Sequence, residues 1–468
     1  MMNDFPATRI LSELNRDNLT PAILFRTSRR QCDEDIERLA SSKVGKLPIP
    51  EQRKIAEEVL AVIAKYNCDP PILLQHPHYH ALISNGVGAH HAGQLLVWRL
   101  LLEELMTRGL LRLMVATGTV AAGVDFPART VIITAHSRRG TEGFNTLTSS
   151  ELMQMAGRAG RRGKDAVGIC LVAPNRFLDA RVVHDIARRP AEPLRSAYFA
   201  APSTVLNLLK HRNVDDLRYT VSRSLAAFLD RKAGAVMREE AKRERAMRPA
   251  GEEGEALKRT EKRERRKVRM AEELETRQIV QLDLALTGLE KLGYMQGGSL
   301  SPKGYWAAEL YTSLVLELGE AVNDGLLNDL SAYELAGLVG SIAGDPHRTY
   351  LSIKANPIKK EYFEAMTDIL VRVRTSFQNP NTTETKVVPD AALTVITWMQ
   401  SESWSEFASL LKLAGAAEGD VARLVTQTAD HLNQLSRLHH TFPSMAGTAA
   451  EARKLLLRPP LSESVVGD

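Results

Sequence analysis

Two arginines three residues apart stand in a short segment of small residues. Residues 154–163 read Gln-Met-Ala-Gly-Arg-Ala-Gly-Arg-Arg-Gly, which puts Arg158 and Arg161 on one side of a helix or turn. The glycines and alanines between them allow a close backbone approach. Planar, always-charged guanidinium groups suit phosphate oxygens, and an arginine at a transferring phosphoryl group is worth roughly 10³–10⁵ in rate. The segment predicts a phosphate contact; the alternative is an ordinary charged surface.

A second segment mixes hydroxyls, glycines and one acid. Residues 116–129 read Ala-Thr-Gly-Thr-Val-Ala-Ala-Gly-Val-Asp-Phe-Pro-Ala-Arg and directly follow an apolar run. Such a loop can present backbone N–H groups and hydroxyls, including that of Thr119, to phosphates. Asp125, two residues after Gly123, can accept a hydrogen bond from a ribose or orient an arginine. The alternative is a glycine-rich turn between a strand and a helix.

A third segment, residues 86–93, carries the adjacent histidines His90 and His91. No further ligand lies at a zinc-binding spacing, so a metal site is not expected. A turn whose imidazoles donate to a phosphate backbone or to a neighbouring loop fits the segment better.

The elements that must position these segments alternate between strands and helices. Short apolar runs predict strands at 22–25, 111–116, 130–134 and 166–172, and helical spacing predicts helices from Ser28, over 94–107 and over 149–157. This alternation predicts an α/β domain with a parallel sheet covered on both faces. In such sheets ligands sit at the carboxyl ends of the strands, where the loops of interest lie.

A long charged segment follows after two expected helices at 205–210 and 221–229. Residues 231–277 hold 16 Lys or Arg and 11 Asp or Glu, an excess of +5 that equals the net charge of the whole chain. The segment predicts two helices folded back near residues 249–251. Its outer surface is either a solvated coiled-coil face or, along 263–269, a contact for nucleic acid or a partner.

The last 190 residues are expected to be mostly helical. Residues 278–306 predict a helix over 280–292, then a short strand, a turn at 297–298 and a second short strand, as at the end of a winged-helix unit. From 305 to 460 the period is helical, with a capping box from Ser331 to Glu334. A polar loop is expected at 376–390 and a frayed tail at 456–468.

Composition bounds the class of protein. The chain has 468 residues, 61 basic and 56 acidic side chains, 44% hydrophobic and 25% charged residues, which is ordinary for a globular protein and excludes a collagenous or wholly disordered one. Its three cysteines form no C-x-x-C pair, which disfavours a zinc knuckle or a disulfide framework. Without a signal pattern or a run of about 20 apolar residues, we expect a cytoplasmic protein with no membrane partner.

In this order and spacing, the segments resemble the second RecA-like domain of superfamily 2 helicases, in particular the Ski2-like group. Residues 25–30 (Phe-Arg-Thr-Ser-Arg-Arg) are similar to the motif that opens this domain, and residues 90–93 to the HH-x-G element. Residues 116–129 resemble motif V, and residues 154–163 motif VI. Residues 317–336 and 418–424 are similar to the C-terminal helical domain of Ski2 and Mtr4 relatives.

The resemblance implies a RecA-like α/β domain followed by a winged-helix segment and an α-helical bundle. We expect a second RecA-like domain at 1–195, connector helices with a charged hairpin (230–275) and a winged helix at 196–306, and a C-terminal helical domain at 307–468. The G-x-x-x-x-G-K-[ST] and D-E-x-H motifs of a first RecA-like domain do not occur in the sequence. We therefore expect the C-terminal half of a helicase, inactive in ATP hydrolysis by itself.

The resemblance also implies roles for single residues. Arg161 would be the arginine finger, Arg158 would contact the γ-phosphate, and Gln154 would position the nucleotide or the attacking water. The other ATP-binding positions would be Gly123 and Asp125, and the nucleic-acid contacts would come from Arg29, His91 and Thr119.

The cofactor would be ATP with Mg²⁺, bound mainly by a first RecA-like domain supplied in cis or in trans. RNA would be the substrate, single-stranded or a duplex with an overhang. The alternatives are a non-catalytic nucleic-acid-binding or scaffolding protein, and half of a DNA repair helicase.

Overall fold

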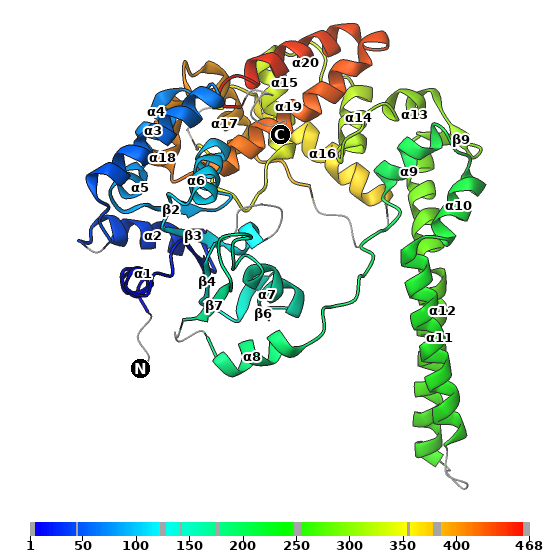
Figure 1. Cartoon of the computed structure of the whole chain (residues 1–468). Coiled ribbons are helices and arrows are strands. Elements are labelled where there is room, and N and C mark those ends of the chain that lie inside the picture. The colour runs from blue at the N-terminus through cyan, green and yellow to red at the C-terminus, as the bar shows by residue number, and fades with distance from the viewer. Residues whose placement is uncertain are drawn as a thin grey trace.

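Five parallel strands form the main sheet, in the order β2-β3-β1-β4-β7 (Figure 1). The computed structural model describes residues 5–43, 45–121, 128–140, 143–173, 178–247, 254–352, 356–377 and 385–461. The strands are β1 (Ala22–Arg26), β2 (Val87–His90), β3 (Leu113–Thr117), β4 (Thr130–Ile133) and β7 (Ile169–Val172). The four expected strands are confirmed, with β7 beginning three residues later than expected. Strand β2 was interpreted as a turn because two of its four residues are small and one is polar.

The sheet is covered on both faces, as the alternation of elements predicted. Along β1, Leu24 packs into a core with α1 (Ala7–Arg16) and α2 (Arg29–Ala40), whereas Ile23 and Phe25 belong to the larger core on the other face. Successive side chains of a strand point to opposite faces, so each strand feeds both cores. The larger core also receives residues of α3 (Ile49–Lys65), α4 (Pro70–Leu74), α5 (Tyr79–Asn85) and α6 (Leu96–Arg108).

Hydroxyl side chains start the helices that flank the candidate loops. The Ser28 hydroxyl accepts a hydrogen bond from the Gln31 N–H over 3.3 Å and so caps the N-terminus of α2. Ser28 lies two residues after the end of β1. A capping box between Thr148 and Glu151 begins α7 (Ser149–Ala156), which follows the antiparallel hairpin β5 (Ser137–Gly140) and β6 (Gly143–Thr146). Helix α8 (Ala180–Arg188) then leads away from the sheet.

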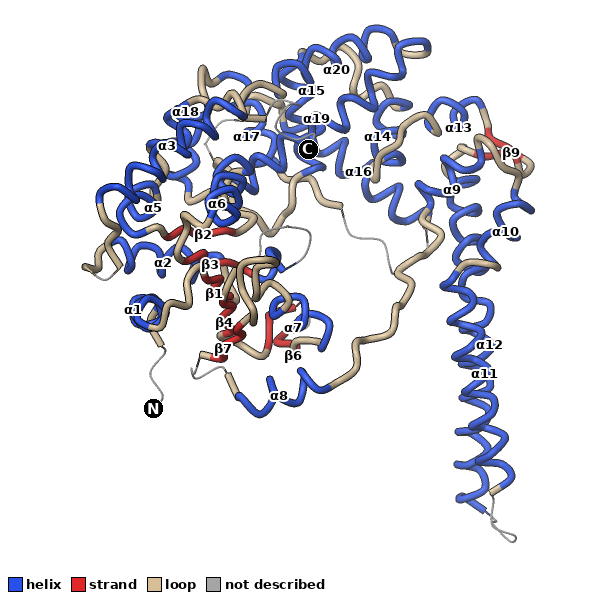
Figure 2. Tube along the Cα trace, in the orientation of Figure 1, coloured by secondary structure: helices blue, strands red, loops and turns tan. Residues whose placement is uncertain are grey.

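Two long helices project from the molecule as a hairpin (Figures 1 and 2). After α9 (Pro202–Leu209) and α10 (Val214–Ser222) come α11 (Leu225–Ala246) and α12 (Gly254–Lys291); we call residues 225–277 the arm. At its base, buried Asp230 accepts hydrogen bonds from Arg277 and Gln278. The two expected helices are confirmed, and the expected break at 249–251 lies outside the described residues. The helix expected at 280–292 is confirmed up to residue 291, as the C-terminal end of α12, which continues from the arm without a break.

A short hairpin and a small helix connect the arm to the C-terminal bundle. Strands β8 (Met295–Gln296) and β9 (Ser299–Leu300) pair antiparallel across Gly297 and Gly298, whose φ angles are +59° and +80°. Such φ values favour glycine, so the strand–turn–strand expected here is confirmed. Helix α13 (Pro302–Ala307) follows.

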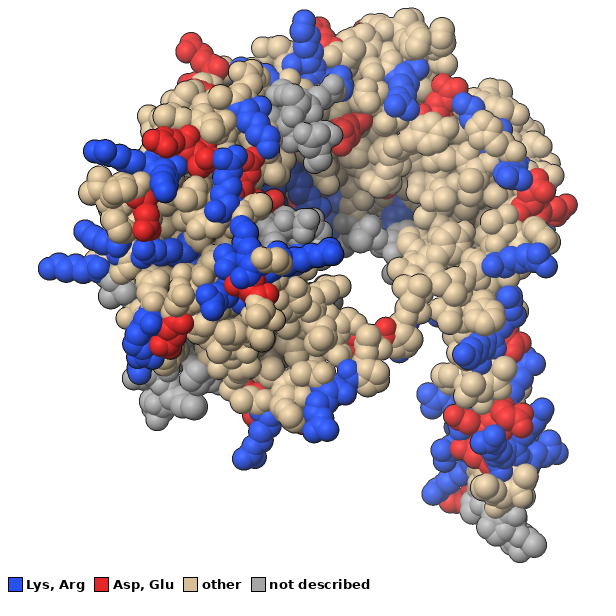
Figure 3. Space-filling model, in the orientation of Figure 1, with Lys and Arg blue, Asp and Glu red and all other residues tan. Residues whose placement is uncertain are grey.

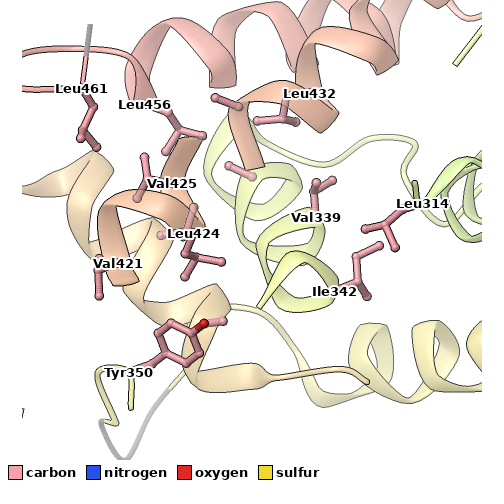
Figure 4. Close-up of a cluster of buried hydrophobic side chains, with 14 of the residues drawn as sticks. Leu314, Val339, Ile342, Tyr350, Val421, Leu424, Val425, Leu432, Leu456 and Leu461 are labelled. Carbon is pink, nitrogen blue, oxygen red and sulfur yellow. The ribbon is translucent and has the colours of Figure 1, made fainter. Parts of the chain in front are cut away.

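The C-terminal helices pack around one buried core, part of which is drawn in Figure 4. They are α14 (Val315–Asn323), α15 (Ala332–Ala343), α16 (Lys360–Ser376), α17 (Pro389–Gln400), α18 (Trp404–Ala414), α19 (Glu418–Ser436) and α20 (Pro443–Leu456). The capping box of Ser331 and Glu334 is confirmed. The frayed tail is wrong up to residue 461, because Leu456 and Leu461 are buried in this core.

Candidate functional site

Backbone hydrogen bonds join the two segments that were predicted to contact phosphates. Beyond α7 the chain turns, and Ala159 forms an isolated parallel bridge with Ala128, at the end of segment 116–129. The Gly160 N–H donates to the Ala128 carbonyl over 2.7 Å, and the Ala128 N–H donates to the Arg158 carbonyl over 2.9 Å. The arginines are thereby fixed beside the loop that precedes β4, at one end of the sheet.

The glycine between the arginines serves a close backbone approach. Gly160 has φ +93°, and a Cβ there would lie 3.1 Å from the Cα of Gly168. A Cβ on Gly168 would lie 2.4 Å from the carbonyl oxygen of Ala159. Only glycine fits at both positions without moving the chain. The close approach expected from the small residues is therefore an approach of this segment to the start of β7.

Arg158 ties the arginine segment to the loop after β3. Its Nε and Nη2 donate to the carbonyl of Ala121 over 3.1 and 2.7 Å, and the side chain is half-buried. Ala121 ends η1 (Gly118–Ala121), the short helical turn that follows β3. The guanidinium thus holds the segment after α7 and the loop after β3 together.

Arg161 is held by a carboxylate four residues later. Its Nε and Nη2 donate to the two oxygens of Asp165 over 2.7 and 2.9 Å, and its backbone N–H donates to the same carboxylate over 3.0 Å. These bonds hold the pKa of Asp165 at about 2, and they raise the pKa of Arg161. Asp165 is 5% exposed and Arg161 20% exposed. The Nη1 edge of the guanidinium is not used by this pair.

The structure describes only one of the three other residues that were predicted to bind ATP. Gln154 lies exposed on the last turn of α7, one turn before Arg158. Gly123 and Asp125 lie outside the described residues. Gly118, which opens the loop after β3, lies against Met155 of α7, where an added Cβ would be 3.1 Å from the methionine methyl group. The structure therefore brings Gln154, Arg158 and Arg161 together at and just after the end of α7. The carboxyl ends of the strands were expected to hold this segment, and this is wrong, because the chain after α7 lies against the amino ends of β4 and β7.

The expected nucleic-acid contacts follow three different strands of the sheet. Thr119 is exposed in η1, and its hydroxyl shares a 2.9 Å hydrogen bond with the hydroxyl of Thr117. Arg29 begins α2, just beyond β1, and its Nη1 donates to Asp420 in the first turn of α19 over 2.6 Å. Arg348 lies 3.5 Å from the same carboxylate. The C-terminal bundle thus reaches the loop that carries Arg29.

His91 is buried rather than exposed at the sheet edge. Its Nδ1 accepts from the Gly93 N–H over 3.2 Å, so Nε2 carries the proton and donates to Asp33 over 2.9 Å. Gln94 also donates to Asp33, over 3.2 Å. The ring is 3% exposed and holds the loop after β2 against α2. Its contact with nucleic acid stays a prediction.

Helix α19 is seated directly on the loop after β2. The Gly419 N–H donates to the Gly93 carbonyl over 3.0 Å. A Cβ on Gly419 would lie 2.4 Å from the carbonyl oxygen of Ala92 and 2.6 Å from that of Gln94. The backbone of the bundle therefore contacts the backbone of the loop after β2 directly, beside Arg29 and His91.

Sequence reasoning missed the acidic partners of these residues. Asp165 follows Arg161 by four positions, and this spacing is a local signal for an ion pair. Asp420 is 391 residues from Arg29, so nothing local in the sequence connects them. Asp33 is likewise joined to His91 only by the fold. No described cluster of three or more His, Cys, Asp or Glu side chains is suited to a metal ion, and no described helix is long and apolar enough to span a membrane.

The bundle that carries α19 matches a known domain family. The DSHCT (NUC185) domain matches residues 297–464, from the β8–β9 turn to the end of the bundle. Residues 297–464 are therefore similar to a DSHCT domain. Together with the relatives below, this domain confirms the resemblance to the C-terminal region of Ski2/Mtr4-like helicases.

Several curated proteins are similar to part of the chain. The exosome RNA helicase MTR4 of Homo sapiens is 30% identical over 221 residues, which are 47% of this chain and 21% of that protein. The human Superkiller complex protein 2 is 32% identical over 226 residues, 48% of this chain and 18% of that protein. The probable helicase HelY of Mycobacterium tuberculosis is 30% identical over 219 residues, 47% of this chain and 24% of that protein. The match thus spans about a fifth of the length of these relatives.

Proposed function

We propose that this chain is the C-terminal part of an ATP-dependent, Ski2-like RNA helicase. It supplies an arginine finger and nucleic-acid contacts to a first RecA-like domain provided in cis or in trans. One observation carries the proposal: the two arginines of the motif VI segment stand at the amino end of a parallel sheet, and a domain similar to DSHCT is docked through Gly419 onto the loop after β2, at the carboxyl end of the same sheet. The names of two relatives, which describe RNA helicase and Superkiller functions, support an RNA substrate.

The residues present fit a triphosphate ligand from one side. Arg161 keeps its Nη1 edge outside the bond to Asp165, and guanidinium groups bind phosphate oxygens bidentately. In the proposed function Arg161 contacts the transferring phosphoryl group, Arg158 orients the loop at Ala121 next to it, and Gln154 positions the nucleotide. ATP with Mg²⁺ supplies the phosphoryl group, and the first RecA-like domain holds most of it. Gly123 and Asp125 complete the proposed contacts.

The nucleic acid in this proposal passes the loops that carry Arg29 and Thr119, with His91 holding the loop after β2. Contacts to the phosphate backbone fix position without reading sequence, so binding is sequence-tolerant and weakens with salt. We further propose that residues 1–195, 196–306 and 307–468 are the RecA-like, connector with winged-helix, and DSHCT units. A cytoplasmic location is part of the same proposal.

The test is ATP hydrolysis after a first RecA-like domain is fused to the chain or added in trans. The chain alone is expected to be inactive. With the added domain and RNA, ATPase is expected, and Arg161→Ala should lower kcat by about 10³-fold or more. Arg162→Ala is the matched control, since it removes a neighbouring exposed arginine. An Arg161→Ala fusion as active as the Arg162→Ala fusion would exclude the arginine finger.

A second function is favoured by the internal partners of both arginines. A chain that had lost catalysis and serves as a nucleic-acid-binding scaffold would keep Arg158 on Ala121 and Arg161 on Asp165 for structure alone. RNA binding that is tight and unaffected by both ATP and Arg158→Ala would support this scaffold. Competition between RNA and DNA of equal sequence separates both from half of a DNA repair helicase.

A further inference from the structure

Five basic side chains form a stripe along the outer side of α12. They form two rows that start from the same two residues, one through Arg266 and one through Arg265 and Arg269, and within each row neighbours are three or four residues apart and so lie on one side of the helix. The stripe consists of Lys258, Lys262, Arg265, Arg266 and Arg269, all exposed. Together with Glu261 they line a shallow groove of about 470 Å³. The side of α12 that faces α11 is different, since Lys267 there is bonded to Glu240 and Glu244, and Ala271 is buried.

The charge of this basic stripe is only partly neutralised. Among the described residues, no ion pair includes Lys258, Lys262 or Arg266. Arg265 lies 3.7 Å from Glu261, and Arg269 lies 3.2 Å from Glu273. The side chains of Arg265 and Arg269 are 84% and 74% exposed, so water screens both pairs. The stripe therefore keeps a concentrated positive charge.

We propose that the basic stripe binds the phosphate backbone of a nucleic acid. The stripe spans 12 residues, and the 11 rises between Lys258 and Arg269 cover about 16 Å at the ~1.5 Å rise per helical residue. One strand of a duplex carries about five phosphates over that length, at ~3.4 Å per phosphate. Five flexible cations thus match five anions. The stripe has no aromatic or large apolar side chain to anchor a folded protein partner, which favours a polyanion.

The proposal is tested on the full chain with a fluorescein-labelled RNA hairpin. The fluorescence anisotropy of the RNA is measured as protein is added, at several KCl concentrations between about 50 and 300 mM. The test variant replaces Lys262, Arg265 and Arg266 by Gln. The control variant replaces Lys232, Lys242 and Arg243, exposed on α11, by Gln, so both remove three charges from the arm. Circular dichroism of both variants checks that the arm remains helical.

We expect the stripe variant to weaken RNA binding at least tenfold at low salt. The slope of log K against log salt should become shallower by about two to three units, at roughly 0.9 per lost phosphate contact. The control variant should change affinity less than threefold. Equal losses in both variants, or no loss in either, overturn the proposal. Displacement of the RNA by polyglutamate of equal charge overturns it in favour of an acidic protein partner. The measurement needs neither ATP nor a first RecA-like domain, so its failure is separate from that of the proposed function.

Discussion

Asp165 holds one side of the Arg161 guanidinium. Two of the three nitrogens of Arg161 are bonded to this carboxylate, and the pair is largely shielded from water. Asp165 therefore orients Arg161 within the arginine segment while leaving its Nη1 edge available. The Asp165 carboxylate also accepts a hydrogen bond from the backbone N–H of Arg161, which fixes the turn between the two residues. The position of the proposed finger is set by an acid that the motif arginines alone do not reveal.

Replacing Asp165 by Asn should lower the free energy of unfolding by about 1–3 kcal/mol at pH 7, because a charged and shielded partner of Arg161 is lost. The pKa of Asp165, about 2 in the fold, lies below its ordinary value of 3.8. The stabilisation is thus complete above pH 4 and disappears as the pH falls to 2. Urea denaturation of both proteins across this range measures the difference.

The control for this prediction is Asp17→Asn. Asp17 also accepts two hydrogen bonds from one arginine, Arg16, but on the surface. Exposed pairs contribute about 0.2–1 kcal/mol, so this variant should be close to wild type. If both variants lose the same free energy of unfolding, the burial of Asp165 does not strengthen its ion pair with Arg161.

The buried carboxyl group of Glu317 should make stability depend on pH in the opposite direction to Asp165. It lines a cavity of about 650 Å³ between α14 and α16, and burial raises its pKa from 4.5 to about 7. The folded protein holds the extra proton between these pH values, so stability falls as the pH rises from 4.5 to 7. Glu317→Gln should add about 1–2 kcal/mol at pH 8 and nothing at pH 4.5. Exposed Glu290→Gln serves as the control in thermal unfolding.

At the level of elements, the sheet could be predicted because its strands are apolar runs separated by helical periods. The position of the arginine segment was predicted wrongly, since a segment that leads from a helix into a parallel strand lies at the amino end of that strand and not at the carboxyl end. The length of α12 could not be predicted, because the charged arm and the apolar end of the same helix have different compositions. The tail was misjudged for a related reason: Leu461 is buried by contacts with helices distant in sequence.

The close contact between α19 and the loop after β2 requires glycine at position 419. Gly419→Ala should destabilise the protein by about 1–3 kcal/mol, because its Cβ would overlap the carbonyl oxygens of Ala92 and Gln94. Gly447→Ala in α20 is the matched control, since nothing lies within 4 Å of the added Cβ. That change should stabilise by about 0.5–1 kcal/mol through helix propensity. Equal effects of both substitutions in urea denaturation would contradict the close junction.

For the molecule as a whole, the arm stands outside the larger hydrophobic core. The larger core runs from β1 to Leu461 and includes the base of α12, whereas the arm buries little beyond small residues such as Ala241 and Ala271. We expect amides of 235–246 and 257–270 to exchange hydrogen at least tenfold faster than those of α15, because local opening exposes little apolar surface. Mass spectrometry of exchange at neutral pH measures this. Equal protection of the arm and α15 would contradict it.

Helix α12 also has a mechanical consequence. Its 38 residues form one unbroken rod of about 57 Å at the ~1.5 Å rise per residue. The rod is held in the larger core near its C-terminal end, where Leu282 and Leu289 are buried. From Leu282 to Gly254 the rod measures about 42 Å, so a tilt of about 5° at Leu282 would move Gly254 by about 4 Å. A small adjustment in the bundle would thus be magnified along the arm into a displacement larger than a hydrogen-bond length.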